Sequence, residues 1–185
     1  MKVSITTKKD IRFNAPVDEA LPKEVVKKGM SQYILSNGSF SLIDLIDYLL
    51  EFTGPATIYI STWVASQASQ ASIQHILDFL ENQRCNKLYF LIDPMFKSKQ
   101  PELHKYLYDT FPGHITEHAN HAKFTCIFND DWNITIETSA NLNKNKRLEN
   151  FRVTEDQGFT DFMKGVFETI QQGIKDGKKL DEVFA

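Results

Sequence analysis

The amino-acid sequence predicts an α/β domain in which helices flank both faces of a mixed β-sheet. Between residues 56 and 108, apolar runs of strand length alternate with segments of helical period, as expected for strands joined by crossover helices. A turn signal at 129–131 joins two further strand candidates as an antiparallel hairpin. The chain has 185 residues, 42% of them hydrophobic and 24% charged, which suits one globular domain with a buried core.

The first 30 residues are charged and weakly patterned, and Pro16 and Pro22 interrupt them. This pattern is typical of an irregular or loosely attached arm. We therefore expect an N-terminal arm over residues 1–30 and a single domain over residues 31–185.

The first predicted helix follows the turn signal Ser36-Asn37-Gly38, with Ser39 or Ser41 as its cap, and ends at Gly54-Pro55. Its apolar residues between Leu42 and Leu50 recur at helical spacing. Apolar runs and turn residues then place the remaining elements. We expect strands over residues 56–63, 87–93, 121–128, 132–141 and 151–153, and helices over 67–82, 101–108 and 161–175.

Charge and cysteine content restrict the class of protein. The net charge of −3 gives no global basic signature, so a polyanion would have to meet a local patch. No window reaches the apolar length of a membrane span, and the N-terminus lacks the apolar core of a signal peptide. Cys85 and Cys126 lie in or beside apolar segments, which indicates buried thiols in a reducing compartment. We therefore expect a cytoplasmic protein that does not bind membranes.

Four polar residues share a regular spacing on the predicted hairpin. Side chains alternate along a strand, so His121 and Lys123 point to the same side, and Ser139 and Asn141 have the same relation on the next strand. A hairpin brings the start of its first strand beside the end of its second, so all four are expected to converge. Lysine supplies charge, asparagine and serine supply neutral donors, and histidine can attack or carry a proton. The set suits an oxyanion.

These residues resemble the signature of the phospholipase D superfamily. That signature is a histidine, any residue and a lysine, then a small-residue turn containing Ser-x-Asn, and later a glutamate. Here the matching residues are His121 and Lys123, then Ser139 and Asn141 within the run Thr-Ser-Ala-Asn-Leu, then Glu149. The resemblance is sharp over residues 118–153.

The resemblance implies cleavage of phosphodiesters without a metal or another cofactor. One histidine attacks phosphorus and forms a phosphohistidine, while a second protonates the leaving oxygen and then activates water. This chain has a single histidine-x-lysine pair, so the resemblance implies a homodimer that shares its site. Lys123 and Asn141 would hold the nonbridging oxygens, Glu149 would orient His121 and favour its imidazolium, and Ser139 would assist.

The sequence departs from the signature at two positions. The aspartate five residues after the lysine is replaced by Phe128, and the glycine before the serine is replaced by Thr138. The missing aspartate puts full activity in question.

Other residues near the motif have two interpretations each. Lys144, Lys146 and Arg147 follow it and form either a solvated loop or a basic rim that binds substrate. Aromatic residues could stack on bases, although core packing is favoured for Tyr59 and Trp63. Trp132 is a further stacking candidate.

A zinc motif is the main competing interpretation. His114 to His118 spells H-x-x-E-H, a peptidase signature that requires a helix. Pro112-Gly113 before it and the Ile-Thr pair inside it favour extended chain instead, in which the two histidines lie too far apart to share an ion. Glu137 shares a strand face with the motif residues, and a salt bridge or edge position is favoured for it.

Two functions remain for this constellation. The leading hypothesis is a metal-independent phosphodiesterase, in particular a nuclease, with DNA favoured over RNA and a lipid substrate disfavoured. The alternative is a nucleic-acid-binding or scaffold protein that has kept the phosphate pocket and lost turnover. The fold alone does not separate these substrates.

Overall fold

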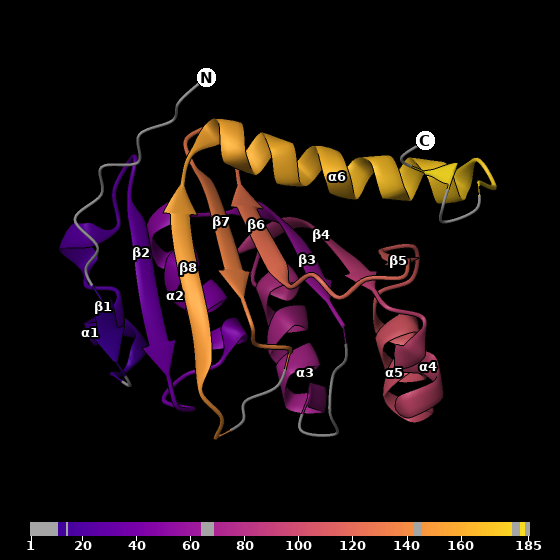
Figure 1. Cartoon of the computed structure of the whole chain (residues 1–185), viewed down its shortest axis with the longest axis horizontal. Coiled ribbons are helices and arrows are strands. Elements are labelled where there is room, and N and C mark those ends of the chain that lie inside the picture. The colour runs from indigo at the N-terminus through magenta and orange to yellow at the C-terminus, as the bar shows by residue number, and fades with distance from the viewer. Residues whose placement is uncertain (1–10, 14, 64–68, 143–145, 179–181, 184–185) are drawn as a thin grey trace.

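The protein, described here by a computed structural model, has one eight-stranded sheet in the order β1-β2-β8-β7-β6-β3-β4-β5 (Figure 1). The structure describes residues 11–13, 15–63, 69–142, 146–178 and 182–183. Neighbouring strands are parallel for β1 with β2, β3 with β4 and β4 with β5, and antiparallel for the other pairs. The strands are β1 (Ile11–Phe13), β2 (Ser31–Ser36), β3 (Ala56–Thr62), β4 (Cys85–Ile92), β5 (Ile115–Glu117), β6 (Phe124–Phe128), β7 (Asn133–Thr138) and β8 (Glu149–Glu155).

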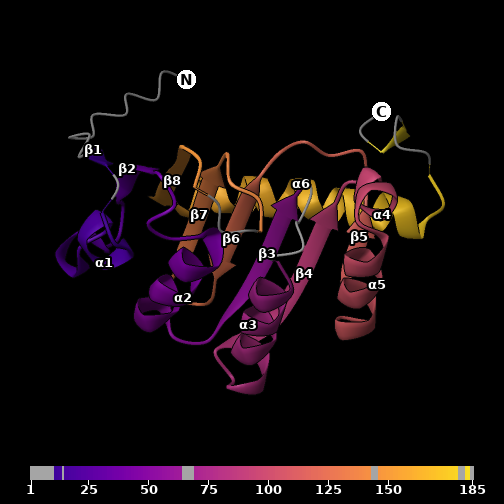
Figure 2. The ribbon, with the colours of Figure 1, turned by 90° about the horizontal axis from the view of Figure 1, so that it is seen from below.

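Helices cover both faces of the sheet, as predicted. Figure 2 shows α2, α3 and α5 on one face and the long α6 on the other. Two groups of buried side chains correspond to these faces, since Phe124 and Cys126 of β6 pack with Phe167 of α6, whereas Ile127 packs in the larger core. The helices are α1 (Val17–Ala20), η1 (Lys23–Val25), α2 (Leu42–Thr53), α3 (Ser69–Glu81), α4 (Met95–Lys99), α5 (Pro101–Thr110) and α6 (Gln157–Lys175).

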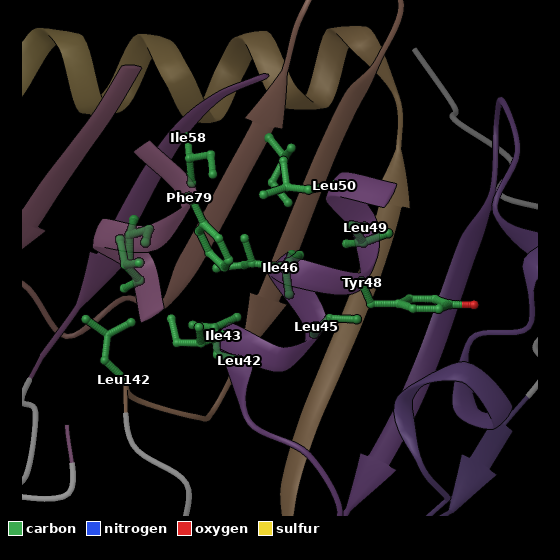
Figure 3. Close-up of a cluster of buried hydrophobic side chains, with 14 of the residues drawn as sticks. Leu42, Ile43, Leu45, Ile46, Tyr48, Leu49, Leu50, Ile58, Phe79 and Leu142 are labelled. Carbon is green, nitrogen blue, oxygen red and sulfur yellow. The ribbon is translucent and has the colours of Figure 1, made fainter. Parts of the chain in front are cut away.

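Helix α2 supplies much of the larger core, and its ends are set by local sequence. Ser41 is the N-cap, and it forms a reciprocal capping box with Asp44. The helix ends at Gly54, whose φ of 65° favours glycine. Its buried side chains pack toward Ile58 of β3 and Leu142 (Figure 3).

Most of the predicted elements are confirmed with shifted ends. The predicted strand over residues 121–128 begins only at β6, and the predicted strand over 132–141 stops at Thr138. The strand expected at 151–153 extends over all of β8. The sequence pattern missed β2, β5 and α4, which are short or carry few consecutive apolar residues.

Residues 11–13 and 15–30 differ from the irregular, loosely attached arm that the sequence predicted. Strand β1 extends the sheet beside β2, and Leu21 and Met30 are 0% and 4% exposed. The hydroxyl of Tyr48 donates to the carbonyl of Leu21 at 2.8 Å. Isolated apolar residues between prolines carry no periodicity, so the pattern did not reveal that they are buried. The division of the chain at residue 30 stays a prediction.

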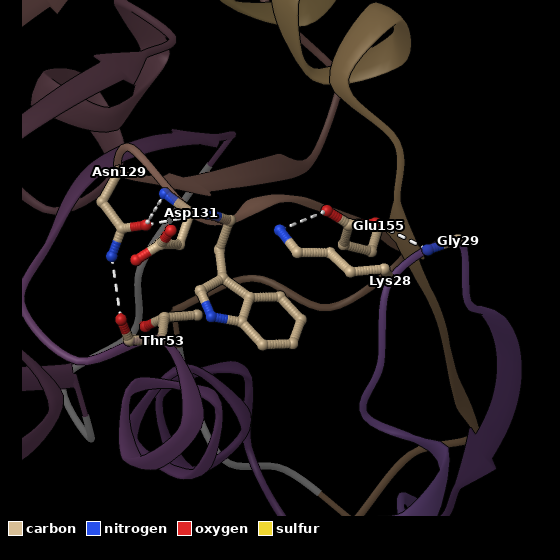
Figure 4. A network of polar contacts seen from close by, with 7 residues as sticks. Lys28, Gly29, Thr53, Asn129, Asp131 and Glu155 are labelled. Carbon is tan, nitrogen blue, oxygen red and sulfur yellow. Dashed lines mark hydrogen bonds and ion pairs between the residues drawn. The ribbon is translucent and has the colours of Figure 1, made fainter.

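The β6–β7 turn closes the end of the sheet away from the predicted site (Figure 4). The Asn129 side chain accepts from the backbone N–H groups of Asp131 and Trp132 and donates to the carbonyls of Thr53 and Pro55. Beside it, Lys28 lies 4.5 Å from the centre of the Trp132 ring. Trp132 packs against the core at this end, so the structure does not support a base-stacking role in the predicted site.

The two cysteines are buried, as the sequence predicted. Cys85 and Cys126 are buried free thiols, and burial raises the pKa of each to about 12. Among the residues that the structure describes, no helix is both long and apolar enough to span a bilayer. The cytoplasmic location stays a prediction.

The burial of Leu21 predicts that the N-terminal segment contributes to stability. We expect Leu21→Ala to lower the free energy of unfolding by about 2–4 kcal/mol, because it removes apolar contacts and leaves a cavity. Urea denaturation would measure the change. Lys27→Ala, at an exposed position nearby, is the matched control and should change stability by less than about 0.5 kcal/mol. Equal stability of the two variants would contradict the packing described here.

Candidate active site

Four neighbouring strands bring the predicted site residues to one end of the sheet. His121 and Lys123 lead into β6, while Ser139 and Asn141 follow β7. Glu149 begins β8, and β3 borders β6 on its other side. This is also the carboxyl end of the parallel strands β3 and β4, where α/β sheets commonly bind ligands. It lies at the lower end of the central strands in Figure 1.

Side-chain hydrogen bonds fix the segment that carries His121. The Asn120 amide group donates to Ser61 Oγ at 2.8 Å, and the Asn120 backbone N–H donates to Asp93 Oδ2 at 2.9 Å. The Ala122 N–H donates to Asn120 Oδ1, and the Ala122 carbonyl accepts from Ser61 Oγ at 2.9 Å. These side-chain bonds replace ladder bonds, which explains why the strand begins three residues later than predicted. Asn120 and Ser61 are positioning residues that the motif did not indicate.

Trp63, at the end of β3, lies beside the motif. Its ring centre is 4.9 Å from that of His121, and Lys123 Nζ lies 5.9 Å from the indole centre. Trp63 is half-buried and packs against neither group of buried side chains, so the expectation that it packs into the core is wrong. Tyr59, by contrast, packs between Tyr89, Phe128 and α6 as expected.

Lys123 carries its charge in a partly buried position. Its ammonium donates to the His121 carbonyl at 3.1 Å, which links the two residues through the backbone. Burial lowers the pKa of Lys123, and the negative charge of Glu149 partly offsets this effect. A lysine that costs free energy to keep charged is typical of a functional site rather than of a structural ion pair.

Ser139 and Glu149 form a direct pair. The Ser139 hydroxyl donates to Glu149 Oε2 and accepts from the Asn150 N–H at 3.1 Å. A hydroxyl has one proton, so in this state Ser139 holds the carboxylate of Glu149. The predictions that Glu149 orients His121 and that Ser139 has a secondary role both stay predictions.

Asn141 is held from β3. Its Oδ1 accepts from Thr62 Oγ1 at 3.3 Å, which fixes the oxygen of the carboxamide toward that strand. Its neighbours in the chain, Ala140 and Leu142, are buried at 3% and 1% exposure. Buried Ala140 and Leu142 therefore anchor this segment, while Ser139 and Asn141, which alternate with them, stay accessible to solvent.

The two residues that depart from the motif, Thr138 and Phe128, both make contacts that support the fold. Thr138, in place of the glycine, accepts from the Ala140 N–H and donates to the Asn150 carbonyl at 2.7 Å, so it supports the turn. Phe128, in place of the aspartate, packs in the α6-side core, and Lys164 Nζ lies 4.2 Å from its ring centre. No carboxylate occupies position 128.

The basic residues after the motif are only partly described. Lys146 and Arg147 are exposed near the start of β8, and Lys144 lies outside the described residues. Their substrate-binding role stays a prediction. Glu137 forms an ion pair with Arg152 on β8 at 3.8 Å, which is the salt bridge favoured for it.

The zinc motif forms extended chain, as its composition favoured. Its middle residues are strand β5, and the Glu117 carboxylate accepts from Tyr108 at 2.9 Å and lies 2.7 Å from His104 Nε2. His114 contacts the Leu88 carbonyl instead. No group of three metal-ligating side chains gathers within the described part of the chain.

The comparison with solved structures agrees with this architecture, whereas the two sequence comparisons found no match. No protein-family model matches the sequence, and no curated protein matches it. The structure is similar to the crystal structure of Nuc, a phospholipase D family member from Salmonella typhimurium, with a TM-score of 0.51 and 13% sequence identity. The likeness covers 78% of this chain and 95% of the Nuc chain. The α/β fold of this protein is therefore that of a phospholipase D-like domain.

The lowered pKa of Lys123 predicts a stability cost at the site. The unfolded chain binds more protons between the folded-state pKa and the ordinary value of 10.5, so the contribution of Lys123 to the free energy of unfolding rises with pH across that window. At pH values below the folded-state pKa, Lys123 is charged in the folded protein and the full loss of stability is present. We therefore expect Lys123→Met to be at least as stable as the wild type at pH 7, with a smaller advantage at pH 10.

Denaturant unfolding at the two pH values would measure this difference. Lys146→Met, at an exposed position, serves as the control and should show no such pH dependence. Clear destabilisation of Lys123→Met at pH 7 would mean that Lys123 serves the fold rather than the site.

Proposed function

We propose that this protein is a metal-independent phosphodiesterase, and specifically a nuclease that acts on DNA in preference to RNA. The observation that carries the proposal is the position of His121, Lys123, Asn141 and Glu149 at the same end of the adjacent strands β6, β7 and β8. The phospholipase D-like fold supports it, as does the order of the motif residues.

The proposed reaction has two displacements at one phosphorus. An imidazole nitrogen of His121 attacks phosphorus, and the bond from phosphorus to the leaving oxygen breaks while His121 of the partner subunit donates a proton to that oxygen. Water then attacks the phosphohistidine and gives its proton to His121 of the partner subunit, and the phosphorus–nitrogen bond breaks. The products are an alcohol and a phosphomonoester, and both imidazoles are restored.

The remaining groups stabilise charge. Lys123 supplies a cation and Asn141 supplies an amide donor to the nonbridging oxygens as negative charge develops on them. Glu149, held by Ser139, places a negative charge near Lys123 and partly offsets the cost of keeping that ammonium charged. Partial burial of Lys123 strengthens its attraction to a bound anion.

Phe128 favours a second candidate function. A phenylalanine replaces the signature's aspartate and packs in the core, so any support that the carboxylate gives to catalysis is missing at this position. A nucleic-acid-binding or scaffold protein would keep Lys123 and Asn141 for phosphate and need no turnover. Binding without cleavage would identify this case.

A cleavage assay with EDTA tests the catalytic proposal. We expect plasmid and single-stranded DNA to be cut in the presence of EDTA, and His121→Ala to lower the rate by about 10³-fold or more, because it removes the nucleophile. His75→Ala, at a half-buried histidine of α3, is the matched control and should keep full activity. Cleavage that depends on added metal, or that survives in His121→Ala, would contradict the mechanism.

A second test concerns the shared site. The mechanism needs two histidines and each chain supplies one His121, so we expect a dimer by sedimentation, and a specific activity that falls on dilution below its dissociation constant. Leu148, which is 60% exposed beside Glu149, is a candidate contact between the copies. Leu148→Asp should weaken the dimer.

The matched control is Phe162→Asp on α6, because Phe162 is also exposed, at 64%, but lies on a helix that begins at the other end of β8. It should leave the dimer intact. A wild-type protein that stays monomeric at micromolar concentration while cleaving DNA would rule out the two-histidine mechanism.

A further inference from the structure

A second lysine reaches the motif from outside it. Lys99, the last residue of α4, places its Nζ 4.4 Å from the centre of the Trp63 ring. The same indole has Lys123 Nζ 5.9 Å from its centre, and its ring is tilted by 47° against the His121 ring. Three groups that can carry positive charge therefore meet on one aromatic side chain.

This arrangement limits how far the two lysines are from each other. Both ammonium nitrogens lie close to one ring centre, so they are at most about 10 Å apart. The two ammonium groups are therefore near enough to contact two phosphates of one strand, whose charges recur about every 3.4 Å along the axis of a DNA helix. When one phosphate is bound at His121, Lys99 would contact the neighbouring phosphate of the same strand.

The surroundings explain why Lys99 points to this place. Cation–π attraction to an indole is favourable, and Lys99 is exposed, so its ammonium lies over the ring while remaining accessible to water. Two cations on one indole repel each other, and a bound polyanion would relieve that repulsion. The alternative is that Lys99 only covers Trp63, which predicts no effect on substrate.

We propose that Lys99, held over Trp63, binds a phosphate next to the one at His121 and Lys123, so that the site selects a chain of phosphodiesters over a single phosphodiester. This inference rests on the proposed function and makes Lys99 and Trp63 specificity determinants of the same site. The substrate class is a polynucleotide with consecutive phosphates.

The test compares two substrates and three variants. An oligothymidylate of about 20 nucleotides offers consecutive phosphates, whereas bis(p-nitrophenyl) phosphate offers one. We expect Lys99→Ala to lower kcat/KM for the oligonucleotide about tenfold, because a charged contact is lost, and to leave the small diester unchanged. Lys99→Arg should restore most of the rate, and Lys97→Ala, at an exposed lysine of the same helix, is the matched control.

Binding gives a second readout that does not need turnover. The slope of log affinity against log salt for the oligonucleotide should become shallower by about 0.7 in Lys99→Ala, as one contact with single-stranded nucleic acid is lost. If the wild type binds but does not cleave, the proposed activity fails and this slope still decides the role of Lys99.

Other outcomes would contradict the role of Lys99 and the proposed activity separately. Equal behaviour of Lys99→Ala and Lys97→Ala, or equal losses on both substrates, would overturn the role of Lys99 while leaving the proposed activity intact. A wild-type protein that neither binds the oligonucleotide nor cleaves either substrate would overturn both proposals.

Discussion

The antiparallel pairing of β3 with β6 is the constraint on which the site depends. This register sets Ser61 opposite Phe124, so the residues just before β6 meet the end of β3. Ser61 then binds the segment that carries His121, and the next two residues of the chain contact the candidate site, Thr62 through Asn141 and Trp63 through His121. Since side chains alternate along a strand, a slip of one residue in this register would turn these side chains to the opposite face of the sheet and break the contacts.

Polar groups at the site are supported by apolar burial on either side of them. Ala140 and Leu142 are buried next to Asn141, and Phe124 is buried next to Lys123. Full burial of a side chain of leucine or phenylalanine size contributes about 1.5–3 kcal/mol, which offsets the cost of holding a lysine away from water. The site can therefore carry an unfavourable charge because its anchors are part of the core.

The sequence predicted this fold well where the information was local. The serine that caps α2 and the apolar run of β3 are local signals, and both elements appear where expected. Leu21 is buried through contacts with a distant helix, so its neighbours in the chain gave no sign of it. The spacing of His121 and Lys123 marked the motif, because a short signature lies within one segment. Trp63 and Lys99 meet it only through the sheet order and the position of α4, which no spacing encodes.

The place of β8 between β2 and β7 has a consequence for how the chain folds during synthesis. Ser31 pairs with Thr154, so two strands that are far apart in sequence must meet before the sheet is continuous. Until then β2 and β7 each present an open edge, and the N-terminal strands form a separate piece from the rest of the sheet. Pairings of such long range are slow, because the entropy of closing the intervening loop is lost before contacts compensate for it. Glu149 begins this same strand, so a nascent chain brings Glu149 to the other residues of the candidate site only after β8 has been synthesised, and until then the open edges of β2 and β7 are suitable targets for chaperones.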